Sequence, residues 1–234
     1  MTQIIVVDSS SIISIASNCL IGILSRLKQE FDVRFVVGEK VLSETVGRGL
    51  ESKKYRLESF RVLELIKSGV IELIVNDDIM RLTNDIIKIS NKCFKAKGSF
   101  INIIHWGESE MLAIAKQLGA SFVMVDERTT RLLVENPASI REQQEKKLHT
   151  RVEMVGENVE KFKQLVGDLK VIRSTELCVF AFENGFFTSF EKQDVLKADT
   201  SKQRIIGAIL WALKLHGCAI SNDEMDSYIN MFHQ

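Results

Sequence analysis

Residues 3–9, QIIVVDS, open the chain with a short apolar run that ends at an acid. A continuous apolar run of this length predicts a strand buried on both faces, as in a parallel sheet that helices cover. Residues 121–126, SFVMVD, repeat the pattern, again with an acid at the end. Residues 33–37 and 70–75 predict two further strands of the same kind. We therefore expect four strands, with an acid directly after the first and the last.

Helical patterns separate these strands. They cover residues 12–27, 40–49, 56–67, 79–94, 107–118 and 127–135. Strands that alternate with helices indicate an α/β domain with a central parallel sheet and helices on both sides. The single proline, Pro137, stands where this alternation stops. We assign the domain to residues 1–136.

The remainder of the chain predicts a helical C-terminal extension. In the charged segment 137–170, apolar residues recur at alternating spacings of four and three, which is typical of a heptad seam. This segment is either a helix or helical hairpin that packs on the domain, or a seam for a homodimer or another partner. Residues 171–234 show three more helical patterns, over residues 174–183, 202–215 and 222–232. Ser221 and Glu224 predict a capping box at the start of the last one.

Composition narrows the class of protein. The 31 basic and 31 acidic side chains give a formal net charge of zero, which excludes a simple polybasic nucleic-acid binder. No run of 18 apolar residues occurs, so we expect no membrane partner. The four cysteines lack the spacing of a metal site. We interpret them as reduced core thiols of a cytoplasmic protein.

Acids stand where the predicted sheet collects its strand ends. Asp8 and Asp126 each follow a strand, and the carboxyl ends of parallel strands share one edge, where ligands bind in such folds. If the two strands are neighbours, their backbones lie only ~4.8 Å apart. Glu108 extends the apolar stripe of its helix, and Glu44 follows a strand-to-helix turn among apolar residues. Glu110 lies on another side of the same helix from Glu108, and we expect it to be a solvated acid in the first turn.

Two interpretations of these acids stay open. All-oxygen sites suit Mg²⁺ or Mn²⁺, and a divalent ion would relieve the repulsion among Asp8, Glu44, Glu108 and Asp126. Alternatively, each acid only caps a helix or forms a surface ion pair, as Glu44 would with Arg48.

Four segments together resemble the PIN-domain nuclease family. They are IIVVDSS at residues 4–10, VLSETV at 41–46, GESEMLAIA at 107–115 and VDERTTR at 125–131. The resemblance covers roughly residues 1–135. It implies a three-layer α/β/α fold and metal-dependent endonuclease activity, usually on RNA. The family's metal ligands would then correspond to Asp8, Glu44, Glu108 and Asp126.

Further candidate residues follow from this resemblance. Glu127 stands where many relatives carry a second Asp, which makes it a possible fifth metal ligand. Ser10 matches a position at which the family often has a hydroxyl beside the first acid; a plain helix cap is the equal alternative. Basic residues near the acids would contact RNA phosphates, foremost Arg128 and Arg131, with Lys53 and Lys54 after Glu44.

The predicted function is therefore an endoribonuclease that cleaves RNA phosphodiesters with Mg²⁺ or Mn²⁺. The alternative is a catalytically inactive PIN-like scaffold, or a module that binds nucleic acid or protein through the helical extension. The chain is longer than the PIN toxins of toxin–antitoxin pairs, which speaks against a toxin role. A haloacid-dehalogenase-like phosphatase is excluded because Ser10 occupies the position of its second aspartate.

Overall fold

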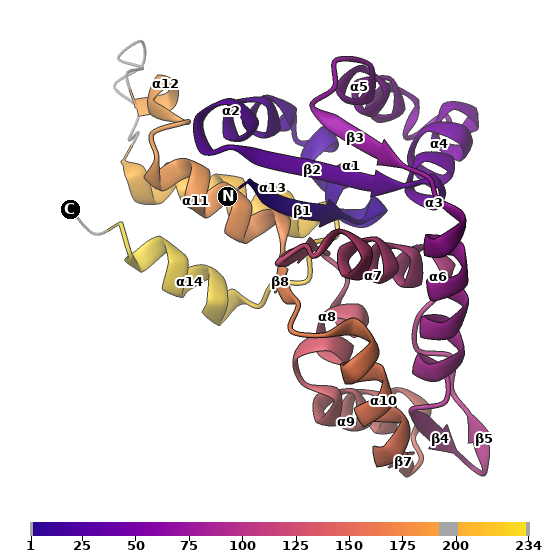
Figure 1. Cartoon of the computed structure of the whole chain (residues 1–234). Coiled ribbons are helices and arrows are strands. Elements are labelled where there is room, and N and C mark those ends of the chain that lie inside the picture. The colour runs from indigo at the N-terminus through magenta and orange to yellow at the C-terminus, as the bar shows by residue number, and fades with distance from the viewer. Residues whose placement is uncertain (1, 192–200, 233–234) are drawn as a thin grey trace.

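The computed structural model describes residues 2–191 and 201–232. Five strands form one parallel sheet in the order β3-β2-β1-β6-β8 (Figure 1). The strands are β1 (Gln3–Val7), β2 (Val33–Gly38), β3 (Ile71–Ile74), β6 (Phe122–Met124) and β8 (Lys170–Ile172). All four predicted strands are confirmed. The strand order reverses between β1 and β6, which makes the carboxyl end of this pair the expected place for a ligand.

Helices cover both faces of the sheet, as the alternation predicted. Ile5 and Val7 of β1 belong to one hydrophobic core and Val6 to another, because successive side chains of a strand point to opposite faces. The first core also contains side chains of α1 (Ser9–Ser17), α2 (Ile21–Phe31), α5 (Arg56–Lys67), α11 (Ser174–Glu183), α13 (Lys202–Leu215) and α14 (Asn222–Asn230). The second contains side chains of α6 (Asp77–Ser90), α7 (Trp106–Leu118), α8 (Arg128–Glu135), α9 (Pro137–Leu148) and α10 (Gly156–Val166).

The expected helix over residues 12–27 is wrong as a single helix. It is two helices, α1 and α2, bent by 110° to each other. Cys19 lies in the break with a left-handed backbone, φ 57°, and is exposed, so it is not a core thiol. Cys93, Cys178 and Cys218 are buried and free, as expected. No single helix among the described residues is long and apolar enough to cross a membrane; α1 and α2 meet that criterion only together.

Residues 39–51 are helical in three pieces. They are α3 (Glu39–Leu42), the π-helical turn η1 (Ser43–Gly47) and α4 (Arg48–Glu51). The short α12 (Thr188–Glu191) follows much later. Single π-turns inside helices are rare overall. Those that do occur are often found at functional sites. This one carries Glu44, one of the predicted site residues.

Residues 137–170 do not form a single helix; two separate helices of this segment pack on the domain, which is closer to the helical-hairpin alternative. The segment runs through α9, β7 (Val152–Met154), α10 and β8. His149 and Gly167, both at positive φ, end the two helices. β7 pairs with β4 (Phe94–Ala96), and β4 with β5 (Ser99–Phe100), in a small antiparallel sheet at the far end of α6 (Figure 1). Val152, Val159, Phe162 and Val166 of this spacing are buried, whereas Leu148 is 40% exposed. A homodimer or partner contact through this segment stays a prediction.

The later helices agree closely with their predicted ranges. α11 and α13 match residues 174–183 and 202–215, and α14 ends two residues before the predicted 232. The capping box of Ser221 and Glu224 is present. β8 lies across the predicted boundary at residue 170 and adds a fifth strand to the sheet, next to β6.

Candidate functional site

Asp8 and Asp126 lie at the ends of neighbouring strands. Val7 pairs with Met124 in the sheet, and the Asp8 N–H donates to the Met124 carbonyl at 2.9 Å. Both carboxylates are buried, with relative exposures of 5% and 1%. The predicted adjacency is therefore confirmed, and both acids stand at the point where the strand order reverses.

Asp8 caps helix α1. Its Oδ2 accepts hydrogen bonds from the Ser10 N–H at 3.0 Å and from the Ser10 hydroxyl at 2.6 Å. Burial raises the pKa of Asp8 to about 6; the bonds from Ser10 oppose this rise, and the nearby charge of Glu108 adds to it. Asp8, and not Ser10, is therefore the N-cap of α1. The Ser10 hydroxyl donates to Asp8, so a hydroxyl does lie beside the first acid, as the resemblance implied.

Glu108 and Glu44 come close to Asp8 from two other elements. Glu108 is half-buried in the first turn of α7, where its Oε2 accepts from the His105 N–H at 3.0 Å. Glu44 accepts from the Ser9 hydroxyl at 3.0 Å, so it is tied to the residue next to Asp8.

Glu44 pairs with Lys40 at 3.7 Å and not with Arg48, so the predicted ion pair is wrong. The π-turn adds a residue to its turn, and this shifts Arg48 away from the position that faces Glu44 in a regular helix. Glu44 also contacts the start of α7: a Cβ placed on Gly107 would lie 3.7 Å from its Oε2.

Glu110 is buried, so the prediction of a solvated acid is wrong. Only 9% of it is exposed, and its Oε2 accepts from the Lys40 N–H at 2.9 Å, so α7 caps α3. A Cβ on Gly38 would lie 2.1 Å from that oxygen, which shows that the carboxylate fills the space the glycine leaves. Burial raises the pKa of Glu110, and the Lys40 N–H partly offsets the rise. The sequence feature that points to this contact is Gly38, a glycine between a strand and a helix, which leaves space for another side chain.

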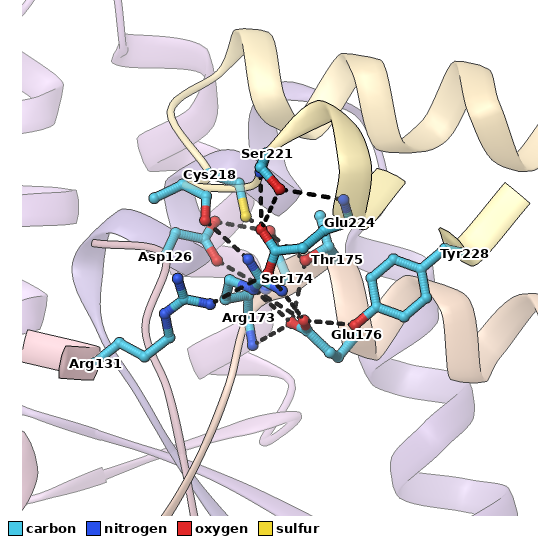
Figure 2. A network of polar contacts seen from close by, with 11 residues as sticks. Asp126, Arg131, Arg173, Ser174, Thr175, Glu176, Cys218, Ser221, Glu224 and Tyr228 are labelled. Carbon is cyan, nitrogen blue, oxygen red and sulfur yellow. Dashed lines mark hydrogen bonds and ion pairs between the residues drawn. The ribbon is translucent and has the colours of Figure 1, made fainter. Parts of the chain in front are cut away.

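Asp126 holds a helix far along the chain. Its Oδ1 accepts from the Ser174 N–H and its Oδ2 from the Ser174 hydroxyl, both at 2.7 Å (Figure 2). Burial raises the pKa of Asp126, and the two bonds from Ser174 lower it. Because both oxygens are engaged, direct metal coordination would compete with these bonds. Glu127, the other candidate ligand here, caps α8 by accepting from the Thr130 N–H at 2.8 Å.

An ionic network beside Asp126 was not anticipated (Figure 2). Arg173 is 4% exposed; it pairs with Glu176 and with Glu224, the latter at 3.0 Å, and donates to the Ala219 carbonyl at 2.9 Å. Tyr228 donates to Glu176 at 2.8 Å. The run RSTE at 173–176 was the signal, since it combines a helix start with an ion pair.

The two predicted RNA-binding arginines differ in their surroundings. Arg131 lies 3.8 Å from Glu224, with 18% of its side chain exposed, so it belongs to the network around Arg173. Arg128 is exposed at the start of α8. Of this pair, Arg128 is therefore the better placed to meet a phosphate.

The acids at this edge share one contact type. Asp8, Glu108, Glu110, Asp126 and Glu127 each accept from the N–H groups at the start of a helix. Helix N-termini carry a partial positive charge, so they offset the negative charge that gathers here. The capping interpretation is thus correct for Asp8 and for Glu108, which accepts at the start of its own helix. It is wrong in detail for Asp126, because Asp126 caps α11 and Glu127 caps α8, the next helix.

Only a small subset of the predicted metal ligands could bind one divalent cation together. Within residues 2–191 and 201–232, no three His, Cys, Asp or Glu side chains are close enough to hold a metal ion together. Mg²⁺, however, commonly binds through one or two carboxylates and completes its shell with water and substrate phosphate. Asp8 and Glu108, whose charges interact, are the candidates for such a pair, and Glu44 is hydrogen-bonded to Ser9, the residue next to Asp8.

Comparison with known proteins supplies no family. No family model, no curated protein and no solved structure matches this chain.

Proposed function

We propose that the protein is a Mg²⁺- or Mn²⁺-dependent endoribonuclease with a PIN-like, three-layer α/β/α core. One observation supports this most: a buried carboxylate, Asp8, lies where the strand order reverses, has its pKa raised in part by the charge of Glu108, and has no cationic side chain among its described contacts. Keeping an acid there costs free energy through desolvation and like-charge repulsion. A divalent ion at the pair would remove that cost.

The roles of the chain's own groups follow from their contacts. Asp8 and Glu108 would hold the ion, and a divalent ion at such a site supplies an activated water and neutralises charge on the leaving oxygen. The Ser10 hydroxyl fixes the orientation of Asp8, while Ser9 and Lys40 fix Glu44 beside the pair. Asp126 has a structural role in this proposal: it joins the end of β6 to the start of α11 and does not contact the substrate.

RNA is the proposed substrate, bound through local positive charge. Lys53, Lys54 and Arg128 are exposed, on the segments that follow Glu44 and Asp126 in the sequence. Binding by such side chains releases counterions from the RNA and weakens as salt rises.

A non-catalytic scaffold is the second candidate. The observation that favours it is the engagement of both Asp126 oxygens by Ser174, together with the capping contacts of the other acids. In that case the acids stabilise helix starts, and the helical extension supplies the binding surface.

The deciding experiment measures metal binding and cleavage on the same samples. The full chain, its Asp8→Asn variant and a Glu157→Gln control would be compared with Mn²⁺ and labelled single-stranded RNA. Glu157 is an exposed acid of α10 that pairs with Lys161, and α10 carries none of the predicted site residues. Calorimetric Mn²⁺ binding and cleavage should persist in Glu157→Gln and vanish in Asp8→Asn. Equal cleavage by all three proteins would refute the nuclease, and folded wild type that binds no Mn²⁺ would favour the scaffold.

A further inference from the structure

The two edges of the central sheet differ in how they are protected. β8 is three residues long and begins with the exposed Lys170. β3 lies at the other edge, beyond β2 (Figure 1), and no strand within residues 2–191 and 201–232 pairs with its outer side. Natural proteins protect such edges with lysine, proline, a bulge or a very short strand, because unpaired N–H and C=O groups attract another strand. The run VIELIV at residues 70–75 contains neither lysine nor proline.

Apolar side chains are exposed at the edge that β3 forms. Leu73 is 38% exposed, and Val75, directly after the strand, is 64% exposed. Met80 of α6 is 52% exposed and lines a small pocket together with Val75. Single exposed apolar residues are ordinary on a protein surface, but these three lie beside the unpaired backbone groups of an edge strand.

The one charged side chain of β3 already has partners. The Glu72 Oε2 lies 2.7 Å from the Arg34 guanidinium, and its Oε1 lies 3.2 Å from the Lys28 Nζ. The hydrogen bond from Arg34 lowers the pKa of Glu72, although burial opposes this. Glu72 is therefore not an unpaired charge of the kind that keeps a second strand away.

Opposite charges stand at the two ends of β3. Lys67 ends α5 just before the strand, and Asp77 begins α6 just after it; both are exposed. In an antiparallel pair of two identical strands, the start of each strand lies beside the end of the other. Such a pair would bring Lys67 of each chain toward Asp77 of the other chain. The charges around β3 are thus complementary to a second copy of β3.

We propose that β3 pairs with β3 of a second copy of this chain, antiparallel and about a two-fold axis at Leu73, so that the two sheets become one. A two-fold axis perpendicular to the sheet keeps each side chain on its own face, so the axis must pass beside a residue and not between two residues. An axis at Glu72 would set two like charges opposite each other, which is destabilising. An axis at Leu73 sets the two leucines opposite each other and covers Val75 with Ile71 of the second copy. The contact uses neither metal nor RNA, so it does not depend on the proposed nuclease.

Sedimentation velocity of the full chain over a series of concentrations tests this pairing. Wild type should form a dimer. Leu73→Lys would set two lysines opposite each other at the axis, so it should raise the dimer dissociation constant about a hundredfold or more. Leu215→Lys provides the matched control, because Leu215 is a leucine at the end of α13 that is 77% exposed. This variant should associate as wild type does.

Charge reversal tests the antiparallel orientation. Lys67→Glu and Asp77→Lys should each weaken the dimer several-fold, and the two changes in one chain should restore it. Restoration is expected because each reversed charge then meets the opposite charge on the second copy.

Three results would overturn the proposal. The first is a wild-type chain that stays monomeric throughout the series. The second is a dimer that persists in Leu73→Lys with a wild-type circular dichroism spectrum; if that variant does not fold, the charge reversals decide, and a double variant no stronger than the single ones counts against the pairing. The third is a dimer that Leu148→Lys disrupts while Leu73→Lys leaves it intact, because the contact would then lie in the segment 137–170.

Discussion

Replacing Arg173 by Met should cost the protein much of its stability. Met keeps the apolar stem and removes the charge, so Glu176 and Glu224 lose their shared partner and the Ala219 carbonyl loses a donor. Removing one member of a buried ion pair costs about 3–5 kcal/mol. The side chains of Glu176 and Glu224 are 28% and 41% exposed, so water takes over part of their interaction. We therefore expect a loss at the lower end, about 3 kcal/mol.

Urea denaturation of the full chain at pH 7 measures this loss, and Lys161→Met provides the matched control. Lys161 pairs with Glu157 on the surface, where both side chains are more than half exposed, and such pairs contribute about 0–1 kcal/mol. A double-mutant cycle of Arg173→Met with Glu224→Gln isolates the coupling between those two residues. The reasoning fails if Arg173→Met costs no more than Lys161→Met, or if the cycle shows no coupling.

Three further outcomes can be tested by the same denaturation. Burial raises the pKa of Glu224, but the bonds from Ser221 and the Arg173 network lower it to about 2. Glu224 therefore stabilises the fold above pH 4.5, its unperturbed value, and that contribution disappears as the pH falls from 4.5 to 2. The difference in unfolding free energy between wild type and Glu224→Gln should shrink in this window, and a constant difference would contradict the prediction. Gly38→Ala should cost about 1–3 kcal/mol because the new Cβ displaces the Glu110 carboxylate, and combining it with Glu110→Ala should cost less than the two single losses together. Ser174→Ala should cost about 1.5–3 kcal/mol by removing a donor to a buried charged oxygen, and a loss below 0.5 kcal/mol, within the usual scatter for surface positions, would show that this bond is weak.

The sheet was predictable because its strands carry a local signal. Each buried strand is a compact apolar run, and the acids after residues 7 and 125 mark strand ends whatever the rest of the chain does. β8 escaped prediction because Lys170–Ile172 is only three residues long and its pairing with β6 is nonlocal. The break at Cys19 depends on a left-handed backbone that no glycine or proline signals.

The candidate site was predictable in position and not in contacts. Strand order brought Asp8 next to Asp126, as the shared edge of a parallel sheet requires. The partner of Asp126 is 48 residues away, and the partner of Glu110 is 70, so no periodicity could reveal them. Glu110 in particular falls on the apparently polar side of its helix, but α3 covers that side.

The bond between Asp126 and Ser174 has a consequence for synthesis of the chain. When Asp126 has just been made, neither β8 nor α11 exists, so the sheet has an open edge and the carboxylate lacks its Ser174 donors. At the ~5–20 residues per second of translation, Ser174, 48 residues further on, follows about 2–10 s later. The residues before β8, nearly three-quarters of the chain, must therefore wait for the last strand of the sheet. Folding of this chain is expected to finish late, and a nascent chain stalled before residue 174 is a natural client for a chaperone.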